Sequence, residues 1–246
     1  MYFAFEQEQS YCIRHLHRYD FIRHNAYQRL RANIFVKQLG WDIPVDSRGR
    51  ERDRYDEMDE DCVQIACVYG KGNWRGAEYL LGGVRTLILK NWDDSMTVNE
   101  FHLIGMIPPS IVSLLKERYD PTDLLEITRL CLQRGHIYEP QREAARHRVL
   151  RFNLAVARDL VYATVYSLVE QTGRKRGLLI VDRYYLRVMQ RSHFVFEELY
   201  SSAQGGKKGY SLTILDLHAT IFAMEKAGAY DRIQRMLSLC AQPITV

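Results

Sequence analysis

Runs of apolar residues along the chain predict a series of β-strands. The first two, at 62–69 and 80–89, are separated by a segment rich in glycine and asparagine, so they predict a hairpin. The Gly82-Gly83 pair inside the second run predicts a bulge or a close approach of another backbone. Four later apolar runs predict further strands, at 124–132, 177–181, 194–196 and 210–214.

Apolar positions that recur every three or four residues predict helices between these strands. The longest covers 141–171, where Leu150, Leu154 and Val161 belong to one apolar stripe. The other predicted helices cover 26–38, 108–116, 184–191 and 216–240. Strands that alternate with helices predict an α/β protein with a mixed sheet and helices on both of its faces.

The composition is typical of a globular protein with one domain. The chain has 246 residues, of which 47% are apolar and 26% are charged, and this length can bury a sizeable core. We assign residues 26–246 to a single domain and residues 1–25 to a polar N-terminal lead-in. A net charge of +4 does not by itself indicate a nucleic-acid partner.

Several features predict a cytoplasmic protein without a metal site. The five cysteines form no C-x-x-C pair, which is typical of reduced thiols in the cytosol. The N-terminus lacks the basic and apolar regions of a signal peptide, and no apolar run approaches the ~20 residues of a membrane helix. His15 and His17 have no further ligand pattern nearby, so we expect no metal there.

Charged residues inside predicted strands are the most informative conflict in the sequence. Glu126 and Arg129 interrupt the apolar run at 124–132, and Arg85 stands in the run at 80–89. Burying such groups is costly unless they are paired, so we expect a functional site or a paired network. Strict alternation would place residues 126 and 129 on opposite faces, whereas a bulge could bring them together.

A second group of candidate residues lies between 26 and 56. Arg31 and Phe35 are four residues apart and share a helical face, and Trp41 follows the expected end of that helix. The sequence Glu51-Arg52-Asp53-Arg54-Tyr55-Asp56 then places three acids within six residues. A solvated loop of mixed charge is the usual interpretation. The alternative is a pocket for a small molecule that carries both an amine and a carboxylate.

Eight of these positions and Phe101, in order and with suitable spacing, resemble a known family between about residues 29 and 135. The family is the bacterial N-acyl-homoserine lactone synthases, which make the autoinducers of quorum sensing. The sequence Glu126-Ile127-Thr128-Arg129 is similar to the E-x-[ST]-R strand of that family. The resemblance implies a three-layer α-β-α fold like that of the GNAT acetyltransferases, with a mixed but mostly antiparallel central sheet. The nine matching residues are Arg31, Phe35, Trp41, Asp53, Asp56, Arg85, Phe101, Glu126 and Arg129.

The resemblance implies an acyltransferase with two substrates and neither a cofactor nor a metal. S-adenosyl-L-methionine would supply the amine, and an acyl thioester would supply the acyl group for the amide. The methionine carboxylate would then attack its own γ-carbon, which closes the lactone and releases methylthioadenosine. The implied catalytic residues are Glu126, Arg129, Asp53 and Arg85, and the implied substrate-binding residues are Arg31, Phe35, Trp41, Asp56, Phe101 and Thr128.

The physical chemistry of these residue types agrees with such substrates. A cationic sulfonium that also carries an ammonium requires nearby carboxylates, which Asp53 and Asp56 can supply. An aromatic face also attracts a sulfonium. Arg31 can pair with the substrate carboxylate or hold the acidic loop by a bidentate contact. Glu126 can help to deprotonate the amine, directly or through water, because an ammonium is not a nucleophile.

The acyl donor can be an acyl carrier protein or coenzyme A. Coenzyme-A-dependent relatives bind pyrophosphate with a glycine-rich loop, but the stretch 133–140 holds one glycine, which favours the carrier protein. An acidic carrier would dock on basic residues, for which we select Arg148, Arg151, Arg158, Arg174 and Lys175. Two alternatives remain: another N-acyltransferase that uses acyl-coenzyme A, and a non-catalytic module that binds nucleic acid or an acidic protein.

Overall fold

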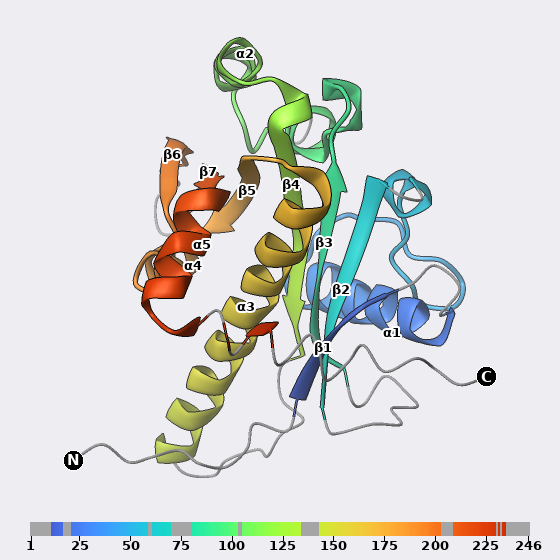
Figure 1. Ribbon diagram of the computed structural model, residues 1–246. Coiled ribbons are helices and arrows are strands. Elements are labelled where there is room, and N and C mark those ends of the chain that lie inside the picture. The colour runs from blue at the N-terminus through green and yellow to red at the C-terminus, as the bar shows by residue number, and fades with distance from the viewer. Residues whose placement is uncertain are drawn as a thin grey trace.

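A seven-stranded sheet forms the centre of the molecule (Figure 1). The computed structural model describes residues 11–16, 21–58, 61–69, 80–102, 105–133, 143–202, 209–229, 231, 233 and 234, with the backbone alone at 12, 69 and 143–153. The strand order is β1-β2-β3-β4-β5-β7-β6. The strands are β1 Tyr11–His15, β2 Cys62–Tyr69, β3 Leu80–Ile88, β4 Leu124–Leu132, β5 Arg176–Asp182, β6 Phe196–Ser201 and β7 Tyr210–Asp216.

Helices cover both faces of this sheet, so the expected three-layer arrangement is confirmed. Helices α3, α4 and α5 contribute to the core on one face. Helices α1 and α2 and two π-helical segments, η1 and η6, contribute to two clusters on the other. Their bounds are α1 Phe21–Arg31, η1 Ala32–Gln38, η6 Thr97–Phe101, α2 Pro109–Arg118, α3 Glu143–Thr172, α4 Arg183–Gln190 and α5 Leu217–Lys226. Short 3-10 turns lie at η2 Arg54–Glu57, η5 Trp92–Asp94 and η7 Pro121–Asp123.

All strand pairs in the sheet are antiparallel except β4 and β5. The mixed, mostly antiparallel sheet and the hairpin of β2 and β3 are therefore confirmed. The predicted bulge near Gly82-Gly83 is also confirmed, because the β3–β4 register shifts between Gly83 and Arg85. A side chain on Gly82 would meet the Cys131 carbonyl oxygen at 2.7 Å, so the close backbone approach is real.

Two expectations from the sequence need correction. Within the expected polar lead-in, residues 11–15 form an edge strand whose Tyr11 and Ile13 are buried. The hydroxyl of Tyr11 donates to Asp159 at 2.7 Å and thereby ties this strand to α3. The predicted helix 216–240 is interrupted after Lys226, where Gly228 takes a left-handed backbone conformation with φ of 66°, and residues 229, 231, 233 and 234 are helical again.

The parallel pair of β4 and β5 separates along its length. Leu124–Ile127 pair with Arg176–Leu179, and no later pair joins these two strands among the residues that the structure covers. The second half of β4, which begins at Thr128, therefore lies beside the place where the strands part. None of the helices in the described part of the chain combines the length and the apolar character that crossing a membrane requires.

Candidate active site

Three arginines and three carboxylates are buried together where α1 meets strands β3 and β4. The carboxylates come from the segment between η1 and β2, while the arginines come from the regular elements. Exposure of these six side chains is at most 3%, except for 13% at Asp53. The members are Arg31, Arg85, Arg129, Glu51, Asp53 and Asp56, and we call them the charge network.

Arg31, near the end of α1, holds the acidic segment in place. Its guanidinium binds Asp56 through two parallel hydrogen bonds of 2.7 and 3.0 Å, and its Nε donates to Glu51. The predicted bidentate contact to the acidic loop is therefore confirmed. These contacts use three of the five N–H donors of Arg31, whose side chain is fully buried.

Arg85 in β3 links the acidic segment to β4. Its Nη1 donates to Asp53 at 2.6 Å and to Asp56 at 3.1 Å. Its Nε donates to the Thr128 hydroxyl at 3.3 Å, and its Nη2 contacts the sulfur of Met96 at 3.3 Å. Thr128 is one of the residues expected to bind substrate, and its hydroxyl already accepts a hydrogen bond from Arg85.

Arg129 reaches the same network because β4 bulges. Its Nε donates to Glu51 at 3.0 Å, and its Nη2 lies 3.4 Å from Asp53. Between one register pair and the next, β4 advances three residues, from Thr128 to Cys131, while β3 advances two. The extra residue turns the Arg129 side chain to the face that Thr128 occupies. The bulge that the sequence allowed is therefore present, although it does not bring Arg129 to Glu126.

Charge balance explains how this network can be buried. Each carboxylate accepts from at least one guanidinium, and the formal charges sum to zero, which offsets the cost of removing them from water. Burial alone would raise the pKa of Asp56, but the charge and hydrogen bonds of Arg31, together with Arg85, lower it to about 2. Asp53 caps η2 and is the most exposed of the three acids.

Glu126 is fully buried but lies apart from the charge network. One oxygen accepts from the amide and the hydroxyl of Thr97, both at 2.6 Å, and the other accepts from the Met96 amide at 3.0 Å. Within the described part of the chain, no arginine pairs with it, so the expected pairing of Glu126 in one network with Arg85 and Arg129 is wrong. Burial raises the pKa of its carboxyl above the usual range, and the hydrogen bonds from Thr97 and Ser95 offset part of that rise.

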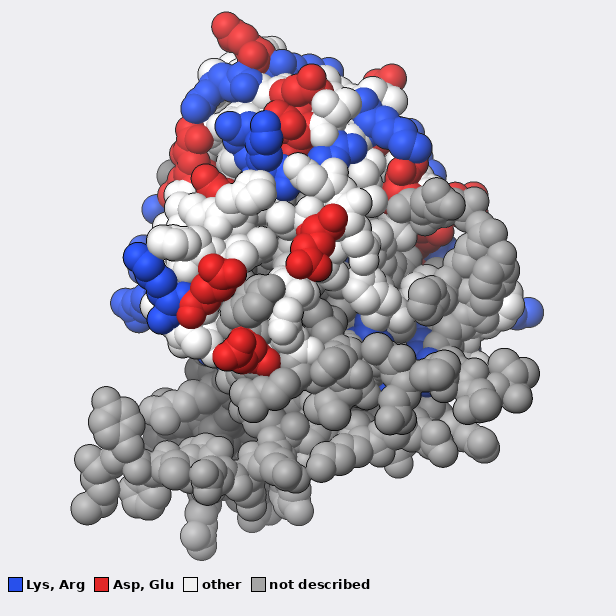
Figure 2. Space-filling view, in the orientation of Figure 1, with Lys and Arg blue, Asp and Glu red and all other residues white. Residues whose placement is uncertain are grey.

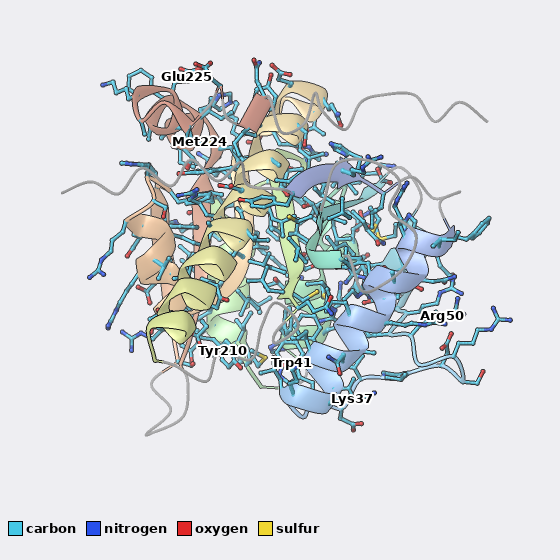
Figure 3. All side chains as sticks on the ribbon, turned by 90° about the horizontal axis from the view of Figure 1, so that it is seen from below. Lys37, Trp41, Arg50, Tyr210, Met224 and Glu225 are labelled. Atoms are coloured by element: carbon cyan, nitrogen blue, oxygen red, sulfur yellow. The ribbon has the colours of Figure 1, made fainter. Side chains whose placement is uncertain are left out.

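Aromatic side chains form a wall next to Arg129. Phe35 from η1 stacks on Trp41 with ring centroids 4.9 Å apart, and Phe101 meets Trp41 edge-on at 6.2 Å. The guanidinium of Arg129 lies 5.3 Å from the Phe35 centroid. Trp41 also donates a hydrogen bond to the Tyr210 hydroxyl on β7, and Figure 3 shows these two side chains beside one another.

Sequence reasoning missed three residues of this region. Glu51 is fully buried and binds both Arg31 and Arg129, although the sequence gives it no more weight than its charged neighbours. Glu100 is half-buried on η6, and its pKa is raised by burial and by the nearby charge of Asp53. Tyr210 carries no polar or charged pattern that could have connected it with Trp41.

The three expected docking residues whose side chains are described do not form one exposed surface. The side chains of Arg148 and Arg151 lie outside the described residues. Arg158 is paired with the buried Asp159 at 2.9 Å, and Arg174 donates to the Pro121 carbonyl. Lys175 is exposed but precedes β5, at the end where β5 pairs with β4 rather than where the strands part.

The described residues contain no group of three or more His, Cys, Asp or Glu side chains that could hold a metal ion. His17, which the sequence considers together with His15, lies outside them.

Comparisons with known proteins give a likeness in fold. No protein-family model matches the chain, and no curated protein matches it. Among solved structures, the CoA-dependent acyl-homoserine lactone synthase BjaI, with SAM and isopentyl-CoA, covers 94% of this chain and all of its own, at a TM-score of 0.60 and 21% identity. The AHL synthase LasI covers 88% of this chain and 95% of its own, at 0.57 and 15%. FeeM, an N-acyl amino acid synthase from uncultured soil microbes, covers 88% and 96%, at 0.50 and 9%. The fold expected from the resemblance is therefore confirmed.

Asp56→Asn is expected to lower the free energy of unfolding at neutral pH by about 3 kcal/mol, because it removes a buried carboxylate charge that Arg31 and Arg85 share. The pKa of Asp56 is lowered on folding, so its stabilisation is present above the ordinary pKa of 3.8 and is lost as the pH falls through about 2. Urea unfolding over this pH range should show the two proteins converging as the pH is lowered.

Asp46 provides a matched control for this variant. Hydrogen bonds from Arg50 lower its pKa to about 2 as well, yet it lies in an exposed loop. Asp46→Asn should therefore change stability little. Equal losses for the two variants would show that burial of the network is not what makes Asp56 important.

Proposed function

We propose that this chain synthesises an N-acyl-L-homoserine lactone from S-adenosyl-L-methionine and an acyl thioester. The observation that carries the proposal is the buried charge network beside the aromatic wall. Its three arginines are balanced by three carboxylates, on a fold that aligns with solved acyl-homoserine lactone synthases. The structure of BjaI was solved with SAM and with isopentyl-CoA, and that of TofI with MTA. Those ligands belong to the two substrates and the by-product of the proposed reaction.

The electrostatics of the site suit a cationic substrate with an amine. The charge network is neutral within itself, so the side of the site that faces it adds no net positive charge. Asp53 keeps part of its carboxylate exposed, and Glu100 lies close enough to Asp53 for their charges to interact. An ammonium placed near these two acids would relieve their repulsion, and the faces of Trp41 and Phe35 attract a sulfonium.

The proposed reaction has two steps. The deprotonated amine attacks the thioester carbonyl, the amide bond forms and the thiol leaves. The substrate carboxylate then attacks its own γ-carbon, which closes the lactone while methylthioadenosine departs. Glu126 is our candidate to receive the amine proton, through a water molecule, because burial raises the pKa of its carboxyl and its described partners are main-chain and hydroxyl groups of residues 95–97.

An exposed stripe of arginines on α4 supports an acidic carrier protein as the donor. Arg183, Arg187 and Arg191 follow one another at intervals of four residues, so they share one helical face. All three are exposed, and no described carboxylate pairs with them. Lys and Arg side chains gather at the left edge of the view in Figure 2, on the side where Figure 1 places α4 and α5.

This stripe also begins next to the site. Asp182, which caps α4, pairs in the sheet with Tyr210, and Tyr210 accepts the hydrogen bond from Trp41. The amide of Arg183 donates to Gly209, the neighbour of Tyr210. A carrier bound along α4 would therefore present its thioester at the end of the aromatic wall. The likeness to the CoA-dependent BjaI favours acyl-coenzyme A as the second candidate donor.

Incubation with S-adenosyl-L-methionine and matched acyl carrier protein and acyl-coenzyme A thioesters should yield an acyl-homoserine lactone and methylthioadenosine in equal amounts. Mass spectrometry of both products is the measurement. If the carrier-protein thioesters give product at lower concentrations than the coenzyme A thioesters, the result would support docking of the carrier on the arginine stripe. The opposite preference would favour acyl-coenzyme A as the donor. Absence of both products with every donor, from folded protein, would contradict the proposed function.

Glu126→Gln is expected to lower kcat about 100-fold, because the amine would lose its general base. In the wild type, the acid limb of the kcat/KM profile should lie above the ordinary glutamate pKa of 4.5, since burial raises the pKa of Glu126. The variant should lose that limb. Glu198→Gln is the control, because Glu198 is exposed on β6 and accepts from Ser211. An unchanged pH profile in Glu126→Gln would show that Glu126 takes no part in the proton transfer.

Arg187→Glu is expected to raise KM for the acyl carrier donor about tenfold and to leave KM for S-adenosyl-L-methionine unchanged. The effect should weaken as salt is added, because charges at an exposed surface are screened. Lys116→Glu on α2 changes the same charge at an exposed position of another helix and should alter neither constant. Equal effects on both substrates, or from both variants, would argue against docking along α4.

A further inference from the structure

We propose that Tyr27 is a positioning residue that fixes Arg129 in the site by holding the main chain of the β4 bulge. Tyr27 lies on α1, far from β4 along the chain, and the sequence pattern predicts no substrate-binding or catalytic role for it. The kinetic consequence rests on the proposed function, whereas the structural consequence can be measured without it.

The main chain at Arg129 needs an external support. Its φ of 52° lies in the left-handed region, which residues other than glycine rarely adopt because the Cβ atom crowds the carbonyl oxygen. In the same stretch the register with β3 shifts, so β4 has an additional residue between two paired positions. A bulged residue has lost its place in the ladder, and a different contact must therefore define its conformation.

Tyr27 supplies that contact. Its hydroxyl donates to the carbonyl oxygen of Arg129 at 2.8 Å, and its side chain is fully buried. A fully buried tyrosine with its hydroxyl on a main-chain carbonyl can hold that carbonyl in one orientation. Because the carbonyl is part of Arg129 itself, holding its orientation also restricts the backbone dihedral angles of that residue.

Gly83 on β3 provides the space that Tyr27 occupies. A Cβ atom on Gly83 would lie 2.4 Å from Cε2 of the Tyr27 ring, closer than real carbon atoms approach. The ring therefore lies directly against the β3 backbone, next to the register shift. This tight fit limits the movement of the ring and, through its hydroxyl, of the Arg129 carbonyl.

Helix α1 thus positions two arginines of the charge network. Arg31, one turn after Tyr27, binds Glu51 and Asp56 directly, and its guanidinium carbon lies 5.5 Å from the Tyr27 ring centroid. Tyr27 acts on Arg129 through the main chain. Both arginines then meet at Glu51, so a shift of the Arg129 backbone would break the contact that joins the two sides of the network.

Tyr27→Phe tests this role, because it removes the hydroxyl and keeps the buried ring. Tyr162→Phe is the matched control: Tyr162 is also buried, donates its hydroxyl to the main-chain carbonyl of Ser192, and stacks on Phe194 away from the charge network. Both variants should lose a comparable part of their thermal stability, since each removes one such hydrogen bond.

The first measurement is the rate at which phenylglyoxal modifies Arg129, located by peptide mass spectrometry. The Arg129 side chain is 3% exposed, and we expect modification about tenfold faster in Tyr27→Phe than in the wild type, with no change in Tyr162→Phe. Equal protection of Arg129 in all three proteins would overturn the proposal. This measurement uses no substrate, so it remains decisive if the chain makes no lactone.

The second measurement is turnover with S-adenosyl-L-methionine and the better acyl donor. We expect kcat to fall about tenfold in Tyr27→Phe and to stay near the wild-type value in Tyr162→Phe, because displacing a site residue slightly is enough to slow a reaction. Gly83→Ala, which forces the Tyr27 ring to move, should give the same loss. Equal turnover in Tyr27→Phe and Tyr162→Phe would show that Tyr27 serves stability alone.

Discussion

Burying three guanidinium groups is the condition on which the rest of this site depends. Arg31, Arg85 and Arg129 come from a helix and two strands whose positions the hydrophobic core fixes. Each would be prohibitively costly inside the protein without a partner. The segment of Glu51, Asp53 and Asp56 supplies these partners, so its path across the site is dictated by the arginines. A loop that looks like a solvated surface in the sequence is thereby held in place by the interior.

The sequence predicted the chemistry of the network better than its geometry. Charges inside apolar strands identified Arg85, Glu126 and Arg129, because such a conflict has few explanations other than pairing or function. It could not separate Glu126 from the arginines, since the amides of Met96 and Thr97 that bind it leave no trace in a residue pattern. Glu51 was missed for a related reason: nothing local distinguishes a buried acid from its exposed neighbours.

The elements of the fold show the same division. Long apolar runs predicted five of the seven strands near their observed places, because two-sided burial forces a continuous apolar pattern. The run at 194–196 overlaps β6 only at Phe196, because β6 is partly exposed and its Glu197 and Glu198 break the apolar pattern. The edge strand Tyr11–His15 was missed, since it is short and lies among basic and histidine residues that mask its buried Tyr11 and Ile13. Its position depends on pairing with β2 and on Asp159 of α3, both of which are distant in the sequence.

Different kinds of contact hold the two sides of the point where β4 and β5 part. On the β4 side, Arg31, Arg85 and Arg129 share their carboxylates, so displacing one alters the partners of the others. On the β5 side, Trp41 hydrogen-bonds to Tyr210, and Phe101 of the aromatic wall packs in one hydrophobic cluster with Leu178, Leu212 and Ile214. Removing one partner from a buried ionic network costs about 3–5 kcal/mol, whereas one neutral hydrogen bond contributes about 1 kcal/mol. Shared charges therefore hold the β4 side, and a displacement there affects all three arginines, whereas apolar packing and one neutral hydrogen bond join the aromatic wall to β5 and β7.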